Sequence, residues 1–282
     1  MYKILKDKLS LLFSEISKSA PLYMPIMKNG HSDFYLWNEN EEYCESELKT
    51  AKSAKDLFFP QSENIISFKK TDGRFTVEVN KKSFEKFVLF GVRGCDLKGI
   101  EVLDKVFLAE PVDEFYAAKR ASGVIITTAC SKPEETCFCS AFGVDASAPG
   151  GDVTTWLDEN NLYWKANTEK GEELTKLLSS VLSECDETGA DSIKKEISEK
   201  LQKLPLSSLS LDGWGESAVK ERFESENWKK LSESCLGCGA CTFVCPTCQC
   251  YDIRDYDTGH GVQRYRCWDS CMYNDFTMMA HG

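Results

Sequence analysis

The first residues of the chain carry apolar side chains at helical spacing. Within residues 3–16 these positions are Ile4, Leu5, Leu9, Leu12, Phe13 and Ile16. Apolar residues three and four positions apart share one side of a helix, and the intervening Lys, Asp, Glu and Ser residues would form its polar side. The pattern predicts an amphipathic helix that packs on the rest of the protein and does not anchor it to a membrane.

Short runs with the composition of β-strands follow this segment. They are residues 65–68, 75–79, 87–92 and 123–128. The Asp72-Gly73 pair predicts a turn between the first two. The runs 87–92 and 123–128 are apolar throughout, which is typical of parallel strands buried on both faces, and a helix-like segment around Ile100 separates them. We therefore predict a βαβ unit and an α/β (α+β) domain with a partly parallel sheet.

The remaining elements of this region lead to a domain boundary. Residues 152–166 predict a pair of strands that turn at Asn160-Asn161. Apolar residues at helical spacing predict two further helices, the second ending before Pro205. The segment 207–215 is polar and contains glycine, so we place the boundary there and predict domains 1–215 and 216–282. A helix rich in Lys and Glu, residues 216–231, opens the second domain.

Charge and length exclude several classes of function. The chain of 282 residues has 45 acidic and 34 basic residues, and its net charge of −11 argues against a nucleic-acid partner. No apolar run reaches the roughly 20 residues that span a bilayer, so we expect no direct membrane insertion. Fourteen cysteines follow an N-terminus without a secretion signal. That combination indicates a reducing, cytoplasmic location and metal binding.

The second predicted domain contains a run of cysteines with a specific spacing. The run reads Cys235-x-x-Cys238-x-x-Cys241-x-x-x-Cys245-Pro246. Bacterial ferredoxins hold cubane iron–sulfur clusters with this arrangement. Zinc is the alternative, because Cys-x-x-Cys pairs also bind zinc, and a disulfide framework would need an oxidising compartment. We predict a small ferredoxin-like [4Fe–4S] domain at residues 216–282.

More cysteines follow in the same domain. They are Cys248, Cys250, Cys267 and Cys271, with a polar loop expected after Cys250 and core packing expected for Trp268. Eight thiolates permit two cubanes, since each cubane takes four. We expect Cys235, Cys238 and Cys241 on one cube, while the other five supply its fourth ligand and up to four ligands of a second site. The spacing does not assign these five individually.

A further set of cysteines falls in the α/β domain. Cys95 follows the strand 87–92, Cys130 follows the strand 123–128, and the next loop contains Cys137 and Cys139. Ligands of parallel sheets gather at the carboxyl ends of the strands, so we predict one four-thiolate site there. The alternative is that these cysteines are small buried apolar residues. Cys44 and Cys185 have no partner in the pattern and are expected to be structural. The total is two to three [4Fe–4S] clusters.

Several blocks of the chain resemble a known family. They are residues 90–100 (FGVRGCDLKGI), 136–139 (TCFC), 245–250 (CPTCQC) and 265–272 (YRCWDSCM). These blocks resemble the family that comprises the iron–sulfur subunit of anaerobic sulfite reductase and the beta subunit of sulfhydrogenase, over nearly the whole chain. The resemblance implies an iron–sulfur subunit that carries electrons between a partner that binds flavin and NAD(P)H and a catalytic subunit such as a sulfite reductase or a hydrogenase. The family usually has a second Cys-x-x-Cys-x-x-Cys…Cys-Pro run, whereas this sequence ends at Ala280-His281-Gly282, which leaves the partner of Cys245 open.

Acid–base machinery is sparse. The chain has three histidines and contains no Gly-x-Gly-x-x-Gly loop, Walker loop or His-Glu-x-x-His motif. We therefore expect no catalytic residues in this chain. We expect the chain to be an electron-transfer component of an oxidoreductase complex and not a catalytic subunit. Two alternatives are a free-standing flavin-dependent reductase, with a pocket above the parallel strands, and a zinc-stabilised scaffold without a redox role.

Overall fold

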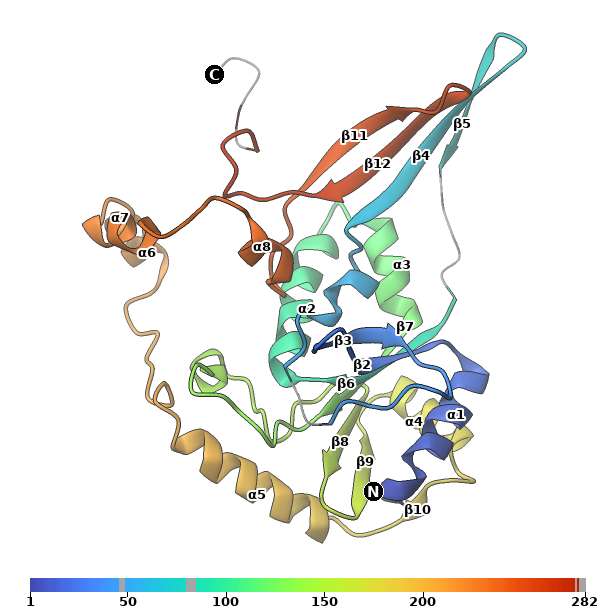
Figure 1. Cartoon of the computed structure of the whole chain (residues 1–282), viewed down its shortest axis with the longest axis vertical. Coiled ribbons are helices and arrows are strands. Elements are labelled where there is room, and N and C mark those ends of the chain that lie inside the picture. The colour runs from blue at the N-terminus through green and yellow to red at the C-terminus, as the bar shows by residue number, and fades with distance from the viewer. Residues whose placement is uncertain (46–48, 80–84, 277, 279–282) are drawn as a thin grey trace.

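The computed structural model describes residues 1–45, 49–79, 85–276 and 278, and the chain end at Ala280-His281-Gly282 lies outside them. Most described strands form one mixed sheet of eight (Figure 1). In spatial order these are β10 (Ser183–Glu184), β1 (Tyr2–Leu5), β9 (Asn161–Ala166), β8 (Val153–Leu157), β7 (Gly123–Thr128), β6 (Phe87–Val92), β2 (Leu22–Lys28) and β3 (His31–Leu36). The four strands β8, β7, β6 and β2 are parallel, and the outer pairs are antiparallel. The predicted partly parallel sheet is confirmed.

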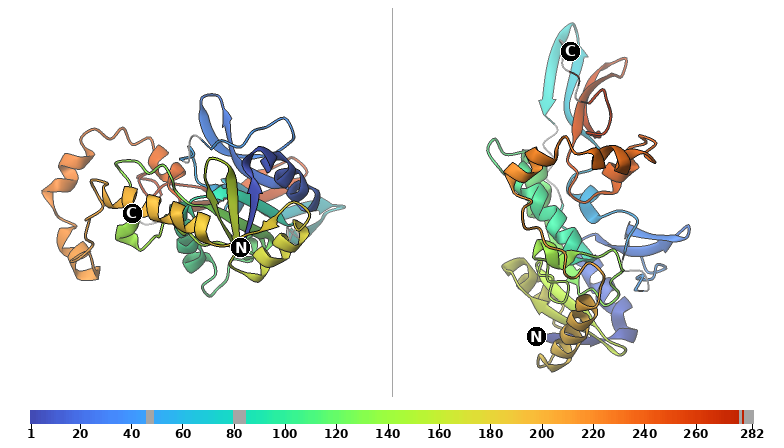
Figure 2. Two further views of the ribbon diagram at one scale, coloured as in Figure 1. Left: turned by 90° about the horizontal axis from the view of Figure 1, so that it is seen from below. Right: turned by 90° about the vertical axis from the view of Figure 1, so that its left-hand side faces the viewer.

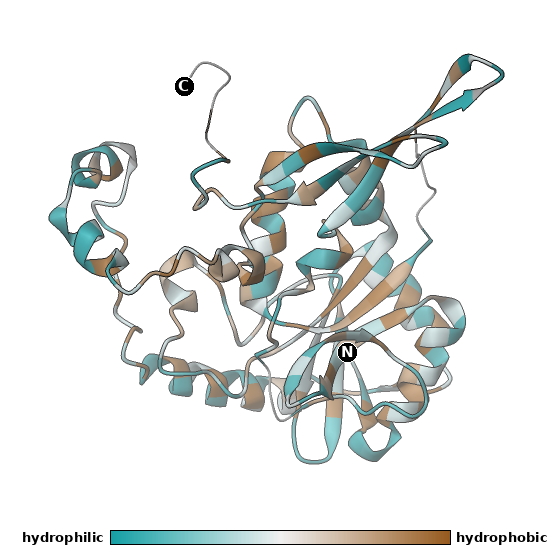
Figure 3. Ribbon diagram, turned by 45° about the horizontal axis from the view of Figure 1, so that its top comes forward, coloured by the Kyte–Doolittle hydropathy of each residue, from teal (hydrophilic) through white to brown (hydrophobic). Residues whose placement is uncertain are grey.

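The continuous apolar runs form the centre of this sheet, as predicted. The side chains of Val88 and Phe90 of β6 lie in the hydrophobic cluster on one face of the sheet, and that of Leu89 lies in the cluster on the other face. A strand buried on both sides needs apolar residues at every position, which explains the absence of alternation. Figure 3 shows these strands as hydrophobic along their length, whereas helix α5 (Thr188–Gln202) is striped with polar residues.

Helices cover both faces of the sheet. Helices α1 (Leu9–Ser19) and α4 (Glu169–Leu177) pack in the cluster that contains Val88 and Phe90. Helices α2 (Gly94–Phe107) and α3 (Glu114–Ser122) pack against Leu89 and Ile125 on the opposite face, and α5 packs beside them on Trp156 and Tyr163. The predicted βαβ unit is therefore β6, α2, α3 and β7.

The N-terminal prediction is wrong in its first half. Residues Tyr2–Leu5 form strand β1, and a 3-10 turn η1 (Lys6–Lys8) follows before α1 begins at Leu9. Strand β1 pairs with β9, where Tyr2 faces Trp164, and buries Ile4. Pairing with a strand some 160 positions away overrides the local helical spacing, since propensity is a weak prior.

A second sheet projects from the α/β layers along the long axis of the molecule (Figure 2). Its strands are β11 (Tyr251–Asp257), β12 (Gly261–Trp268), β4 (Ser62–Thr71) and β5 (Arg74–Val79), in that order and antiparallel throughout. The residues between Cys250 and Arg266, expected as a polar loop, are mostly the β11–β12 hairpin. The many charged residues in this stretch obscure the period-two alternation of a strand.

Buried charges join the second sheet to helix α3. Arg266 of β12 is 3% exposed, and its guanidinium contacts Glu63 of β4 at 2.7 Å and also the carboxylate of Asp113, which caps α3. Lys119 of α3 pairs with the same Glu63. Removing one member of such a network destabilises the protein, because the remaining charges stay buried. These buried ion pairs thus hold the second sheet against the α/β layers. The domain boundary between residues 215 and 216 stays a prediction.

The segment that leads to the cysteine run contains short helices. The predicted helix 216–231 is two helices, α6 (Glu216–Arg222) and α7 (Glu226–Ser232), because Ser225 accepts the Asn227 N–H and starts a new one. Helix α8 (Ala240–Val244) follows within the run. The 3-10 turns η2 (Ala54–Leu57) and η3 (Cys139–Phe142) complete the structure. Among the described residues, no helix has the length and apolar character required to cross a bilayer.

Candidate metal centres

Parallel strand ends bring the cysteines of the α/β domain together. Cys95 is the second residue of α2, directly after β6, and Cys130 follows β7. The thiol of Cys95 lies close enough to those of Cys130 and Cys139 for electrostatic interaction. The thiol of Cys130 is equally close to those of Cys137 and Cys139. The four thiols therefore lie near one edge of the sheet, and their role as one ligand set stays a prediction.

Their surroundings disfavour isolated thiolates. Desolvation by the surrounding protein, with a smaller contribution from Asp96, raises the pKa of Cys95 to about 12 although its side chain reaches the surface. Desolvation likewise raises the pKa of Cys130 to about 11 and shifts the pKa of Cys139 upward. Thiols in such a setting become thiolates when a metal is present to bind them, because coordination favours the deprotonated form.

The cationic side chain of Arg93 lies next to the thiols of the α/β domain. The Arg93 guanidinium donates to Asp96 at 3.0 and 3.1 Å, and it lies within charge range of Cys95, Cys130 and Cys139, where it lowers the pKa of each thiol. Asp96 is 4% exposed and keeps Arg93 in place. Sequence reasoning did not single out Arg93. Its position between an apolar strand and a cysteine was the available signal.

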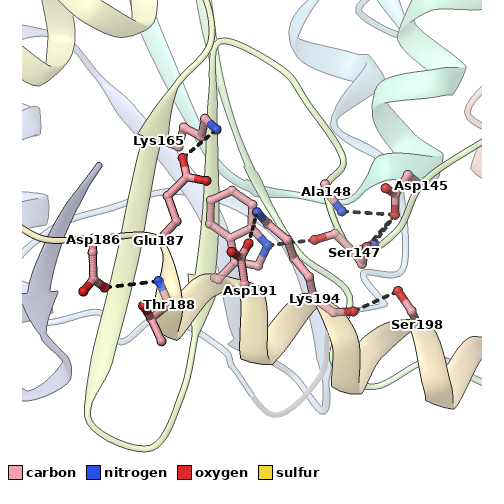
Figure 4. A network of polar contacts seen from close by, with 11 residues as sticks. Asp145, Ser147, Ala148, Lys165, Asp186, Glu187, Thr188, Asp191, Lys194 and Ser198 are labelled. Atoms are coloured by element: carbon pink, nitrogen blue, oxygen red, sulfur yellow. Dashed lines mark hydrogen bonds and ion pairs between the residues drawn. The ribbon is translucent and has the colours of Figure 1, made fainter.

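The loop with Cys137 and Cys139 is supported by helix α5. A cavity of about 180 Å³ lies behind the loop. Its lining includes Cys137, Cys139, Asp145, Ser198, Leu201 and Leu204. Figure 4 shows polar contacts of the neighbouring segments, in which Asp145 accepts from Ser147 and Ala148. Trp156 Nε1–H donates to the Ser147 carbonyl at 2.7 Å, and Lys194 of α5 lies over the Trp156 ring. Hydrogen bonds of Asp145 and Trp156 and the contact of Lys194 with the Trp156 ring therefore stabilise the segments next to the loop.

The cysteine run winds around two left-handed glycines. Gly237 and Gly239 have φ of +67° and +72°, a conformation that other residues adopt only with strain. The Gly237 N–H donates to Cys235 Sγ at 3.4 Å, as expected for a turn whose amides face sulfur. A Cβ at Gly239 would approach the Tyr273 hydroxyl to 2.3 Å, and that hydroxyl donates to the Cys238 carbonyl at 2.9 Å. These constraints fit a cluster-binding turn.

Four of the other cysteines form a second group in this domain. The thiol of Cys248 lies close enough to those of Cys245 and Cys271 for electrostatic interaction, and the thiol of Cys250 lies equally close to that of Cys271. Desolvation and the neighbouring thiol raise the pKa of Cys248 to about 12. Burial alone would raise the pKa of Cys245, but hydrogen bonds from Thr247 and Cys248 leave it below the ordinary value. Burial shifts the pKa of Cys250 upward.

Cys267 is placed differently. It lies on β12 between Arg266 and Trp268, both buried, and alternate residues of a strand point to opposite faces. Its charge neighbours are Arg254, Asp252 and Asp269, and burial raises its pKa. The strand geometry therefore separates Cys267 from the group formed by Cys245, Cys248, Cys250 and Cys271.

The second group is docked on the α/β domain. Pro246 lies against Gly99 of α2, where a Cβ would approach the Pro246 Cβ to 2.6 Å. Lys55 of η2 donates to the carbonyls of Cys245 and Cys248. Phe243 and Trp268 pack in the same hydrophobic cluster as α2. Sequence reasoning identified Trp268 as core packing, which is confirmed, but it missed Lys55, which lies in a polar stretch without a motif.

The donor set fits iron–sulfur clusters, because soft thiolates are the ligands that these clusters use. Within residues 1–45, 49–79, 85–276 and 278, no three Cys, His, Asp or Glu side chains meet at metal-ligating distance. The described cysteines contain no disulfide. Cys44 is buried, and the Cys185 N–H donates to the Met1 carbonyl at the edge of a hydrophobic cluster, which agrees with structural roles for both.

Comparison with known proteins finds two matches of interest. Residues 234–282 match the family model described as a 4Fe-4S dicluster domain. The chain is 32% identical over 273 residues to sulfhydrogenase 2 subunit beta of Pyrococcus furiosus, a match that covers 96% of this chain and 79% of that protein. No solved structure matches the chain. The dicluster match agrees with the predicted small ferredoxin-like domain and with [4Fe–4S] clusters as cofactors.

Proposed function

The chain belongs to the sulfhydrogenase beta subunit family and is an iron–sulfur electron-transfer subunit, and from this premise we propose that it relays single electrons between two partner subunits. One partner binds flavin and NAD(P)H, and the other is a catalytic redox subunit of the sulfite reductase or hydrogenase type. The relay operates in the cytoplasm. The chain itself is a component of the oxidoreductase complex and not its catalytic subunit.

The proposal assigns the cysteines to three sites. A bound [4Fe–4S] cluster supplies reversible one-electron chemistry. Cys235, Cys238 and Cys241 provide three ligands of one site. The second site consists of Cys245, Cys248, Cys250 and Cys271, and the third of Cys95, Cys130, Cys137 and Cys139. Cys267 lies on β12, apart from the second site, and is assigned to none of the three.

Convergence of thiols from distant segments is the observation that supports this proposal most directly. The thiol of Cys95 lies within electrostatic interaction distance of that of Cys139, and the thiol of Cys250 lies within the same range of that of Cys271. Cysteines that act only as small apolar residues are not expected to cluster with one another. The protein partly desolvates Cys95 and Cys130 and places Arg93 next to the site in the α/β domain, and both features affect a cluster's reduction potential.

Metal analysis of the anaerobically purified chain tests the proposal. We expect about eight to twelve irons per chain and an equal amount of acid-labile sulfide, corresponding to about two to three cubanes. Low-temperature EPR after dithionite reduction should show their signals. Fewer than about four irons per chain, less than one cubane, contradicts the proposal. Zinc without sulfide would identify the scaffold, and flavin released on denaturing the isolated chain would identify the free-standing reductase.

Co-purification tests the partners. The tagged chain, isolated from its own cells under anaerobic conditions, should carry a partner that contains flavin and a second redox partner in constant ratio. A stable homo-oligomer without any such partner would contradict the assignment of partners while leaving the iron–sulfur assignment intact.

A further inference from the structure

A lysine is buried beside the second group of cysteines. Lys55 lies in η2, between strands β3 and β4, and is 2% exposed. Its Nζ donates to the carbonyl oxygens of Cys245 at 2.9 Å and Cys248 at 3.1 Å. Lysine is almost never fully buried unless its charge has a partner, so this position requires an explanation.

The third side of the ammonium group faces an aromatic ring. Lys55 Nζ lies 3.8 Å from the centroid of the Trp268 ring, which is itself 8% exposed. A lysine ammonium has three donors, and two carbonyls and one π face satisfy them. The Trp268 Nε1–H is buried and has no hydrogen-bond partner in the part of the chain that the structure describes. The site thus offers an N–H donor in addition to a cation.

Among the described residues, the groups in direct contact with Lys55 Nζ are neutral, although its charge has been removed from water. The carboxylate of the adjacent Asp56 accepts from Lys52 at 3.0 Å. After Asp56, the charge neighbours of Lys55 are the thiols of Cys248, Cys245 and Cys250. Burying a charge is costly unless an opposite charge is near. A group of thiolates that binds a metal cluster is an opposite charge at this place.

Packing fixes Lys55 in its position. Ser53 caps η2 by accepting the Lys55 N–H, and the following Phe58 and Phe59 are fully buried. Phe59 packs against Trp268 with ring centroids 5.7 Å apart. The ammonium is therefore held by its own backbone and by its neighbours, so no reorganisation is needed when charge at the site changes.

We propose that Lys55 is a positioning residue for the cluster at Cys245, Cys248, Cys250 and Cys271, where it fixes the Cys245–Cys248 turn and supplies the positive charge that favours the reduced state. This inference rests on the proposed function. An electron that arrives from the donor adds one negative charge to the site, with no bond made or broken and no proton taken up. A fixed cation stabilises the reduced state more than the oxidised state and therefore raises the reduction potential.

A redox titration of the full chain, loaded with clusters, tests the role of Lys55. The variant Lys55→Met keeps an unbranched side chain as far as Cε and removes the charged Nζ, and Lys55→Arg keeps the charge. The control Lys52→Met removes a charge from the same segment, at a side chain that is 37% exposed and paired with Asp56. EPR of samples poised at fixed potentials reports the reduced fraction of each cluster, and iron and sulfide analysis reports loading.

We expect Lys55→Met to lower the ratio of reduced to oxidised cluster by about tenfold for one EPR signal, which is about 59 mV for a one-electron couple. Iron and sulfide should stay at the wild-type level, Lys55→Arg should restore most of the ratio, and Lys52→Met should change nothing. An unchanged ratio in Lys55→Met, or an equal change in Lys52→Met, overturns the inference. So does loss of iron in Lys55→Met that Lys55→Arg fails to restore, because charge is then not the cause.

The wild-type protein separates this result from a failure of the proposed function. A wild-type chain without iron and sulfide overturns the proposed function and this inference with it. If the wild-type chain holds clusters and their reduction potentials are the same in Lys55→Met, the inference alone is overturned.

Discussion

Gly99 of helix α2 lies directly against Pro246 of the cysteine run, 147 positions further along the chain. Cys95 precedes Gly99 by four residues, so the two lie on one face of α2, about 6 Å apart along its axis. The helix thus carries a thiol of the α/β site at its start and the docked Cys245 segment one turn later. A single rigid element sets the spacing between two of the proposed clusters.

Adding a methyl group at Gly99 tests this contact. In an exposed helix, Gly→Ala stabilises by about 1 kcal/mol. At Gly99 the sign should reverse, because the new Cβ would approach the Pro246 Cβ to 2.6 Å and its carbonyl oxygen to 3.2 Å. We expect Gly99→Ala to destabilise by about 1–3 kcal/mol, measured as a lower thermal midpoint, with perturbed EPR of one cluster. Lys98→Ala, at the exposed neighbouring position, should leave both unchanged, and a more stable Gly99→Ala would disprove the close approach.

The ion pair of Arg93 and Asp96 is expected to stabilise the α/β site. Both side chains are largely buried, at 15% and 6% exposure. Arg93→Met leaves the Asp96 carboxylate buried without its cation, and the expected loss is about 3–5 kcal/mol in the free energy of unfolding. Arg93→Lys should recover little, since the guanidinium donates through two nitrogens to one carboxylate.

The double variant Arg93→Met with Asp96→Leu provides the control for that experiment. It removes both charges and should regain much of the stability lost in Arg93→Met. If the double variant were as unstable as the single one, the loss would come from packing and not from the unpaired carboxylate.

The turn between β8 and β9 gives a pH-dependent prediction. Partial burial alone would raise the pKa of Asp158, but the N–H groups of Asn160 and Asn161 and the Tyr163 hydroxyl donate to its carboxylate and leave the pKa below the ordinary value. A lowered folded-state pKa contributes stability above the unfolded pKa, about 3.9, which is lost as pH falls through the folded value.

Asp158→Asn should therefore cost about 1 kcal/mol at neutral pH, or roughly 2–4 °C in thermal midpoint. The difference from wild type should stay constant down to about pH 5 and shrink below about pH 4. Thermal unfolding of both proteins from about pH 7 to about pH 3 measures it. A difference that grows on acidification would show that another group is responsible.

Cys238 in the first run distinguishes ligands from structural cysteines. Cys238→Ser replaces a soft thiolate with a hard oxygen donor. We expect loss or strong perturbation of one cubane, seen as up to about four fewer irons per chain and a changed EPR spectrum. Cys185→Ser, a partly buried cysteine at the edge of a hydrophobic cluster, is the matched control and should retain wild-type spectra. Unchanged spectra in Cys238→Ser would remove it from the ligand set.

Features that depend on nearby positions follow from the amino-acid sequence alone. The apolar runs of β6 and β7, the helix α2 between them and the thiolate spacing from Cys235 to Cys245 are all local patterns, in which each residue's neighbours in sequence are also its neighbours in space. Strand ends in one parallel sheet face the same edge, so the grouping of Cys95 with Cys130 also followed from local patterns and topology.

Contacts between distant segments were set by the folded chain and not by any local pattern. Tyr2–Leu5 became a strand because β9 was present to pair with it, and residues 251–268 became a hairpin because β4 extends it into a sheet. Lys55 is ordinary in its sequence context, yet the fold buries it against the carbonyls of Cys245 and Cys248. Burial and pairing of this kind depend on residues 190 and 193 positions away, which no periodicity within a short window can report.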